Sequence, residues 1–181
     1  MDEHERLRLE HEQVVQLLRT LTETRFRLLA FIPTLSAAAV ALSSGGRPGV
    51  ELFAIGILGL SATLGILVYE LRNSQIARIA AARARLVEES LLPHGPLNVE
   101  RPEGMPRLFG LLAVWHGRGV ALVYGAALAG WGYLTGWGLL RAAGVGEARA
   151  WGLAIGALAG LLVFAEIERI ERDTEGTNPY G

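Results

Sequence analysis

Cysteine and lysine are both absent from this chain of 181 residues. Without cysteine the chain can form no disulfide, no thiolate nucleophile and no zinc–thiolate site. All 17 basic residues are therefore arginines, which we attribute to genomic base composition and not to function. The formal net charge is −1, so nothing in the composition indicates a nucleic-acid partner.

Charged residues and histidine are also missing from four long tracts, 28–46, 52–69, 119–140 and 150–165, which contain 19, 18, 22 and 16 residues. A hydrocarbon core of about 30 Å needs about 20 helical residues, and charged groups at the ends of a shorter tract can snorkel to the interface. The hydrophobic content of 51% and the mean hydropathy of +0.32 are high for a soluble domain. The sequence predicts an all-α, polytopic membrane protein with four transmembrane helices arranged as two hairpins.

The orientation of these spans follows from the arginines. The first 27 residues mix acidic residues with five arginines and lack the apolar core of a secretory leader. Fourteen arginines lie in the N-terminal arm, the central loop and the tail, against three in the two short turns. Because basic residues resist translocation, we expect an inner-membrane protein with both termini in the cytoplasm.

The expected first hairpin covers residues 1–92. Leu7, Val14, Leu21 and Leu28 recur every seven residues, with His11 and Leu18 between them, which is typical of one helical stripe. We expect a cytoplasmic helix at 5–27, spans at 28–45 and 51–70, and a second cytoplasmic helix at 71–92. The two cytoplasmic helices then pair along their apolar faces as an antiparallel extension of spans 1 and 2.

A proline-rich linker at 93–106 separates this hairpin from the second, which covers 107–181. Residues 107–116 are apolar but too short to span, so they are expected to form an interfacial helix. The spans of the second hairpin are expected at 119–140 and 150–167, followed by a solvated tail.

Small residues and aromatic residues mark the second hairpin. Helices in lipid associate through small residues that allow close backbone approach. The glycines expected at such contacts, within one chain or between chains, are Gly132, Gly136, Gly152, Gly156 and Gly160. The aromatic residues near the outer turn, expected to form an interfacial belt, are Trp131, Tyr133, Trp137 and Trp151.

No charged group lies at mid-bilayer depth in the spans, no serine or threonine there has a base beside it, and the four histidines lack metal-ligand spacing. We therefore expect no enzyme, no cofactor and no metal site. Two polar clusters remain at the inner interface: Tyr69, Glu70, Arg72 and Asn73 after the second span, and His116 and Arg118 before the third. Both fit interface anchors or the lining of a vestibule. The first also fits a contact between subunits, and in the second His116 also fits a pH-sensitive group near lipid phosphates.

Three segments, Thr24 to Arg27, Tyr69 to Gln75 and Val114 to Gly119, resemble those of uncharacterised small bacterial polytopic membrane proteins. This resemblance covers most of the chain and implies no activity. The first half is also similar in layout to SLATT-type membrane effector domains, in which two spans carry cytoplasmic helices on both sides. That resemblance is one of topology, it implies a pore or a membrane-perturbing effector, and the second hairpin departs from it.

Two hypotheses follow. In the first, the chain is a non-enzymatic homo-oligomer in the lipid bilayer, acting as a channel, a pore-forming effector or a membrane scaffold. In the alternative, it is a lipid- or small-molecule-handling enzyme or carrier whose site, at the cytoplasmic interface, uses Glu70, Arg72, His116 and Arg118.

Overall fold

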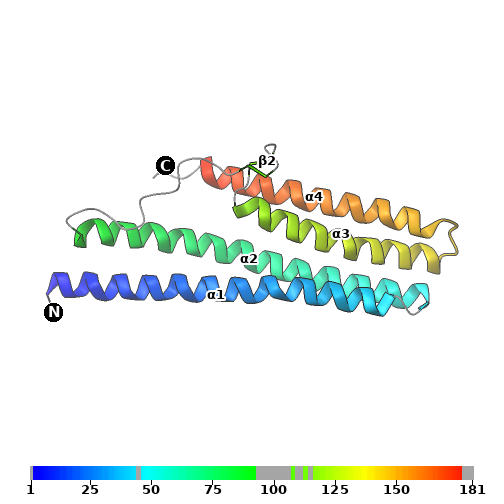
Figure 1. Cartoon of the computed structure of the whole chain (residues 1–181), viewed down its shortest axis with the longest axis horizontal. Coiled ribbons are helices and arrows are strands. Elements are labelled where there is room, and N and C mark those ends of the chain that lie inside the picture. The colour runs from blue at the N-terminus through cyan, green and yellow to red at the C-terminus, as the bar shows by residue number, and fades with distance from the viewer. Residues whose placement is uncertain (1, 44–45, 93–106, 109–111, 114–115, 177–181) are drawn as a thin grey trace. The chain divides into compact units, whose positions relative to one another are not determined.

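The computed structural model describes residues 2–43, 46–92, 107–108, 112–113 and 116–176. These residues form four helices and one very short pair of strands (Figure 1). In chain order the elements are α1 (Glu3–Ser43), α2 (Gly49–Leu91), β1 (Arg107–Leu108), β2 (Leu112–Ala113), α3 (His116–Ala142) and α4 (Ala148–Gly176). The expectation of an all-helical protein is confirmed, apart from the four strand residues.

The two long helices are continuous over 41 and 43 residues. At about 1.5 Å per residue each is roughly 60–65 Å long, about twice the thickness of a bilayer core. Acidic residues in the first turns, Glu3 and Glu5 in α1 and Glu51 in α2, complement the positive end of each helix. Glycine and proline at 45–49 separate the helices, and α2 ends shortly before Pro93.

The prediction of an interfacial helix at 107–116 is wrong for the described residues of that stretch. Arg107 pairs with Ala113 and Leu108 with Leu112 as antiparallel strands, and α3 begins at His116. The physical reason lies in length and composition. A segment of nine or ten residues that contains Gly110 and follows Pro106 cannot offset the cost of nucleating an isolated helix. The linker at 93–106 lies outside the described residues.

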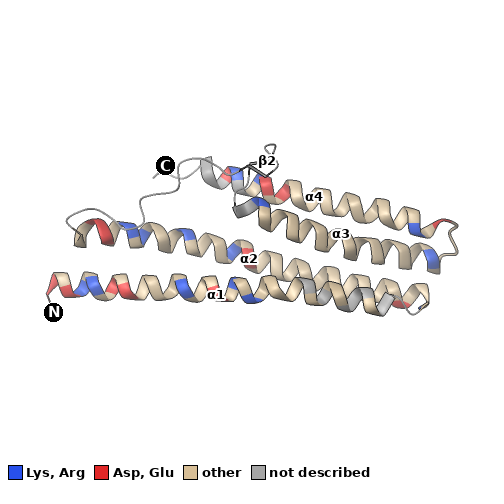
Figure 2. Ribbon diagram, in the orientation of Figure 1, with Lys and Arg blue, Asp and Glu red and all other residues tan. Residues whose placement is uncertain are grey.

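The contacts within the chain divide it into two compact units. Unit 1 contains Met1–Ala30 and Val68–Gly104, and unit 2 contains Phe31–Leu67 and Met105–Gly181. This division differs from the expected one at the linker, because the apolar part of the first hairpin belongs with the second hairpin. Charged residues are concentrated in the unit 1 parts of α1 and α2, whereas the middle parts of α3 and α4 carry none (Figure 2).

Unit 1 is an antiparallel pair formed by the first part of α1 and the last part of α2 (Figure 1). The residues of the predicted stripe on α1, including Leu7, Val14 and Leu21, are partly buried. On α2 the small residues Ala80 and Ala84 are buried. Small side chains on one helix leave room for leucine side chains on the other, which is how two helices pack closely.

Unit 2 has its core between α2, α3 and α4. Its buried members are Leu52 of α2, Trp131, Leu134 and Trp137 of α3, and Ala148 of α4. Two helices in the described part of the chain are long and apolar enough to cross a membrane: α2, and α4 over Ala148–Ile170. Less than a third of either apolar stretch is buried within the protein.

Candidate functional site

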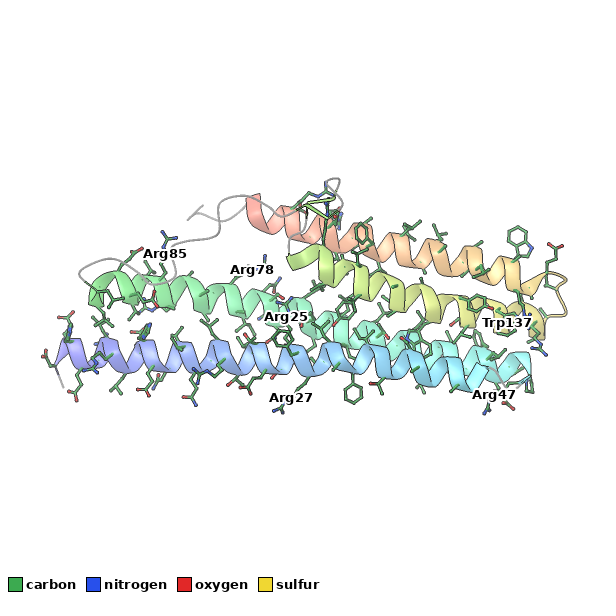
Figure 3. The ribbon with its side chains drawn as sticks, viewed as in Figure 1. Arg25, Arg27, Arg47, Arg78, Arg85 and Trp137 are labelled. Atoms are coloured by element: carbon green, nitrogen blue, oxygen red, sulfur yellow. The ribbon has the colours of Figure 1, made fainter. Side chains whose placement is uncertain are left out.

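The most deeply buried charged group in unit 1 is the carboxylate of Glu70. Its side chain is 1% exposed and pairs with the Arg25 guanidinium across the contact between α2 and α1. Figure 3 shows Arg25 directed toward α2 and Arg27 on the opposite side of α1. A buried carboxylate carries a large desolvation cost that only a close counter-ion can offset. The pair therefore fixes which residues of the two helices lie opposite each other.

Two further polar contacts cross the same helix pair. The Asn73 side-chain amide donates a hydrogen bond to the Leu21 carbonyl oxygen at 3.1 Å. Nearer the chain's N-terminus, His11 Nε2 lies 3.0 Å from Glu88 Oε1, and the Glu88 side chain is 4% exposed. Buried polar residues in a helical seam favour one register and disfavour others. The seam of unit 1 thus contains three polar contacts between leucine and alanine layers.

An exposed ion pair flanks this seam. Arg83 Nε lies 2.5 Å from Glu10 Oε1, and this hydrogen bond to Arg83 lowers the pKa of the Glu10 carboxyl below its usual value. The same contact raises the pKa of Arg83, which stays charged at every physiological pH. Exposed pairs of this kind contribute little to stability but help to set orientation.

The residues predicted at the inner interface belong to both units: Tyr69, Glu70, Arg72 and Asn73 to unit 1, and His116 and Arg118 to unit 2. Glu70 and Asn73 face α1, whereas Tyr69 and Arg72 are exposed, and Arg72 Nη1 donates to Gln75 Oε1 at 3.2 Å. In unit 2, Arg118 Nε lies 2.6 Å from Glu168 Oε1 on α4. His116 is the first residue of α3, and its side chain lies outside the described part.

Arg25 and Glu88 belong to the seam but were not among the predicted site residues. The signal was present, because the stripe alternates steps of four and three residues through His11, Val14, Leu18 and Leu21. The next member of that series is position 25. A charged residue there is compatible with the stripe when a counter-ion lies opposite it, and Glu70 supplies that counter-ion.

The structure places the five predicted glycines at the contact between α3 and α4. A Cβ atom added to Gly156 would lie 2.8 Å from the Tyr133 backbone nitrogen. A Cβ on Gly160 would lie 2.6 Å from the Gly125 carbonyl oxygen. The other three meet the opposite helix in the same way: Gly132 faces Gly156, Gly136 faces Ile155, and Gly152 faces Trp137. Side chains at these positions would force the helices apart.

A second close contact, which was not predicted from the sequence, joins α2 to α3. Gly56 of α2 lies against Thr135, Gly59 against the Trp131 ring, and Gly49 against Ala142. A Cβ on Gly56 would lie 2.6 Å from the Thr135 backbone nitrogen. The sequence could have indicated this contact, because the three glycines are separated by seven and then by three residues. Such spacing is typical of the contact face between two packed helices.

The expectation of an aromatic belt is wrong for two of its four members. Trp131 and Trp137 are buried in the core of unit 2, and Tyr133 is partly buried, whereas Trp151 is exposed. A belt residue needs its ring at the lipid–water interface. The glycines on the facing helices explain the difference, because they open space into which the large rings of Trp131 and Trp137 fit.

Within the described ranges, no group of three His, Asp or Glu side chains is placed to hold a metal ion. Glu70, Asn73 and Glu88 are buried against a neighbouring helix. No protein family, no curated protein and no solved structure matches this chain.

Proposed function

We propose that this chain is a four-span inner-membrane protein without catalytic machinery. It acts as a homo-oligomeric membrane scaffold that holds a charged helical hairpin, unit 1, at the cytoplasmic face. One observation carries the membrane assignment: the apolar side chains of α4 are exposed along its length, as are those of the first part of α2. The exposed members on α4 include Leu153, Ile155, Leu158, Leu161 and Leu162. Exposed apolar surface of this extent supports a hydrocarbon solvent.

The other two spans of the proposal are residues 28–45, which begin in α1, and residues 119–140 of α3. Both tracts are free of charged residues and long enough to cross a bilayer core. Four spans place the fourteen arginines of the arm, central loop and tail on one side, which the preference for cytoplasmic basic residues assigns to the cytoplasm. Unit 1, with its many charged side chains, is then in water (Figure 2).

The absence of catalysis in this proposal is supported by how the polar groups are used. Glu70 and Asn73 are engaged across the helix pair, and Arg118 is engaged with Glu168. Glu70 and Arg118 are two of the four residues of the alternative, an enzyme or carrier at the interface, which also uses Arg72 and His116. Groups committed to contacts between helices are not free to bind a substrate, so we favour a scaffold.

Self-assembly is supported by a second apolar stripe on α2, formed by Ile76, Ile79 and Leu86. It faces away from α1, and Ile79 is 72% exposed. An apolar stripe on a water-exposed helix favours a protein partner. We assign this stripe to a second copy of unit 1, for a reason of charge.

Arg72 and Arg83 lie on the same face of α2 as the stripe, eleven residues apart, and Arg83 is engaged with Glu10 of the same chain. In the register set by the Leu21–Asn73 contact, the exposed Glu23 is level with Arg72. Copies related by rotation about the membrane normal keep each residue at its level. The stripe of one copy can therefore meet the outer face of α1 of the next with opposite charges aligned, and such a face-to-back contact closes into a ring.

Cysteine labelling tests the topology directly, because the native chain has no cysteine. Val50→Cys and Gly146→Cys should react with an impermeant maleimide in intact cells. Glu12→Cys and Ser90→Cys should react only after permeabilisation. Equal reaction at all four positions, or recovery of the protein from the aqueous fraction without detergent, would overturn the proposal.

Ion flux separates the scaffold from a pore. Purified protein in liposomes should leave ion permeability at the level of empty liposomes while running as an oligomer in detergent. Ion flux proportional to protein content would instead assign the chain to the channel or pore-forming class. A monomer without flux would contradict both.

A further inference from the structure

A group of charged and aromatic side chains lies in unit 2, where α3 turns into α4. The Arg141 guanidinium, in the last turn of α3, lies 5.9 Å from the centre of the Trp137 ring. The Arg149 guanidinium, in the first turn of α4, lies 5.0 Å from the same centre. Two cations from two helices thus converge on one indole.

The Trp137 ring is held firmly in place. It is 8% exposed and stacks on Tyr133 with ring centres 5.6 Å apart, and Gly152 of α4 lies directly against its backbone and Cβ. Figure 3 shows Trp137 at the end of α3 that leads into α4. The indole therefore offers the two arginines a fixed surface, and their positions do not depend on a flexible loop.

The positive charge of this group is not neutralised within the described part of the chain. No carboxylate there forms an ion pair with Arg141 or Arg149, although Arg47, Arg83, Arg118 and Arg169 each have one. Two guanidinium groups beside one ring repel each other, and an anion between them removes that repulsion. The indole stabilises the cations but leaves the N–H donors of the guanidinium groups available.

These side chains border a hollow of about 350 Å³, lined by Trp137, Arg141, Glu147, Ala148 and Arg149. Ala148 is the first residue of α4, so the positive end of the helix dipole also faces the hollow. Glu147 adds one negative charge at its edge. Two arginines and a helix N-terminus outweigh that single carboxylate.

We propose that this hollow is a binding site for a phosphate group. Guanidinium groups match phosphate oxygens with paired hydrogen bonds, and the volume suits a headgroup-sized anion. The source we favour is the headgroup of an anionic phospholipid, which rests on the proposed membrane function because the turn then lies at the outer interface. Free inorganic phosphate offers the same chemistry without a membrane.

Titration of the purified full chain in neutral detergent tests the site, with intrinsic tryptophan fluorescence as the readout. The probes are inorganic phosphate, short-chain phosphatidylglycerol and, as a zwitterionic comparison, short-chain phosphatidylcholine. We expect saturable binding of phosphatidylglycerol that weakens at least tenfold in the double variant Arg141→Gln with Arg149→Gln. Glu147→Gln should tighten binding.

The matched control is Arg47→Gln, which removes one arginine from the other short turn, where it pairs with Glu51. This variant should bind as the parent does. Equal loss in Arg47→Gln and in the double variant would reduce the effect to net charge and overturn the site. The paired variant Arg141→Lys with Arg149→Lys keeps the charge but removes the guanidinium fork, so a folded protein with weakened binding supports the proposal.

The probes also separate the sources. Binding of phosphatidylglycerol without binding of inorganic phosphate supports the lipid headgroup, and comparable binding of both supports phosphate itself. No saturable response to either overturns the proposal. Failure of the membrane assignment would appear in the cysteine-labelling experiment and would leave the inorganic phosphate titration interpretable.

Discussion

Arg25 of α1 and Glu70 of α2 form an ion pair in which the carboxylate is almost completely removed from solvent. Such a pair contributes little net stability over an apolar contact of the same shape, because desolvation offsets much of the attraction. Its effect is on specificity: a shift of one helix past the other would leave a buried charge without its partner. The pair therefore acts as a register lock in unit 1.

Removing one partner of this lock should be costly. Arg25→Met leaves the buried Glu70 carboxylate without its counter-ion and is expected to destabilise unit 1 by about 3–5 kcal/mol. Arg27→Met is the matched control, because Arg27 lies on the opposite side of α1 and is exposed (Figure 3). It should change stability by less than about 0.5 kcal/mol. Thermal unfolding in detergent, followed by circular dichroism, measures both.

The double variant Arg25→Met with Glu70→Met separates a register lock from a simple source of stability. It replaces both charges with apolar side chains and should recover most of the loss. A double variant as unstable as Arg25→Met alone would contradict this account.

The hairpin of unit 1 was largely predictable from the sequence, because its signal is local. Leu7, Val14, Leu21 and Leu28 repeat at seam spacing, and the absence of glycine and proline from residues 3–32 predicts the continuous helix that is observed. The polar members of the seam were not predictable with the same ease. Whether Arg25 faces solvent or a partner depends on Glu70, which lies far away in the sequence.

The organisation of unit 2 could not be read from either hairpin alone. Proline residues at 93–106 indicated a boundary, but a boundary in the chain is not a boundary in space. Gly56 and Gly59 allow α2 to approach α3, and this pairing joins segments about 75 residues apart in the sequence. Gly59 lies against Trp131 and Gly152 of α4 lies against Trp137. These contacts account for the burial of two tryptophans that their position near the outer turn had assigned to an interfacial belt.

The Glu10–Arg83 pair predicts a pH dependence. The pKa of Glu10 is lowered in the folded chain, so its contribution is fully present above the usual pKa of a glutamate, about 4.3, and is lost as pH falls through the lower, folded value. The difference in unfolding midpoint between the parent and Glu10→Gln should therefore shrink between pH 5 and pH 3 (order-of-magnitude limits, about one unit either side of the usual pKa). A difference that stays constant or grows on acidification would refute the assignment. Comparing the two proteins cancels the other groups that titrate in this range.

The contact between α3 and α4 predicts a sharp difference between two glycines. Gly156→Leu places a side chain against the Tyr133 backbone and should destabilise the hairpin by at least about 2 kcal/mol. A side chain at Gly130 meets nothing within 4 Å, so Gly130→Leu should be close to neutral. Unfolding in a denaturing detergent series reports both. Equal losses of stability in the two variants would contradict the placement of Gly156 on a packed face and of Gly130 on an exposed one.

The contact between α2 and α3 can be tested in the same manner on α2 alone. Gly56→Leu should separate α2 from Thr135 and expose Trp131, giving a shift in tryptophan emission as well as a loss of about 2 kcal/mol or more. Gly65→Leu adds the same side chain where nothing lies within 4 Å and should leave the emission unchanged. If the emission of Gly56→Leu matched that of the parent, α2 and α3 would not pack as described.

The ring proposed for unit 1 requires opposite charges at matched levels on neighbouring copies, which a charge exchange can test. Arg72→Glu places two carboxylates at one level and should shift the protein from oligomer to monomer, and Glu23→Arg should do the same with two guanidinium groups. The double variant restores an attractive pair with reversed polarity, so it should restore the oligomer. Arg78→Glu, an exposed change of equal charge outside the stripe, should leave assembly intact. Molecular mass in detergent, measured by light scattering, distinguishes these outcomes; a double variant that stays monomeric would place the contact between copies elsewhere.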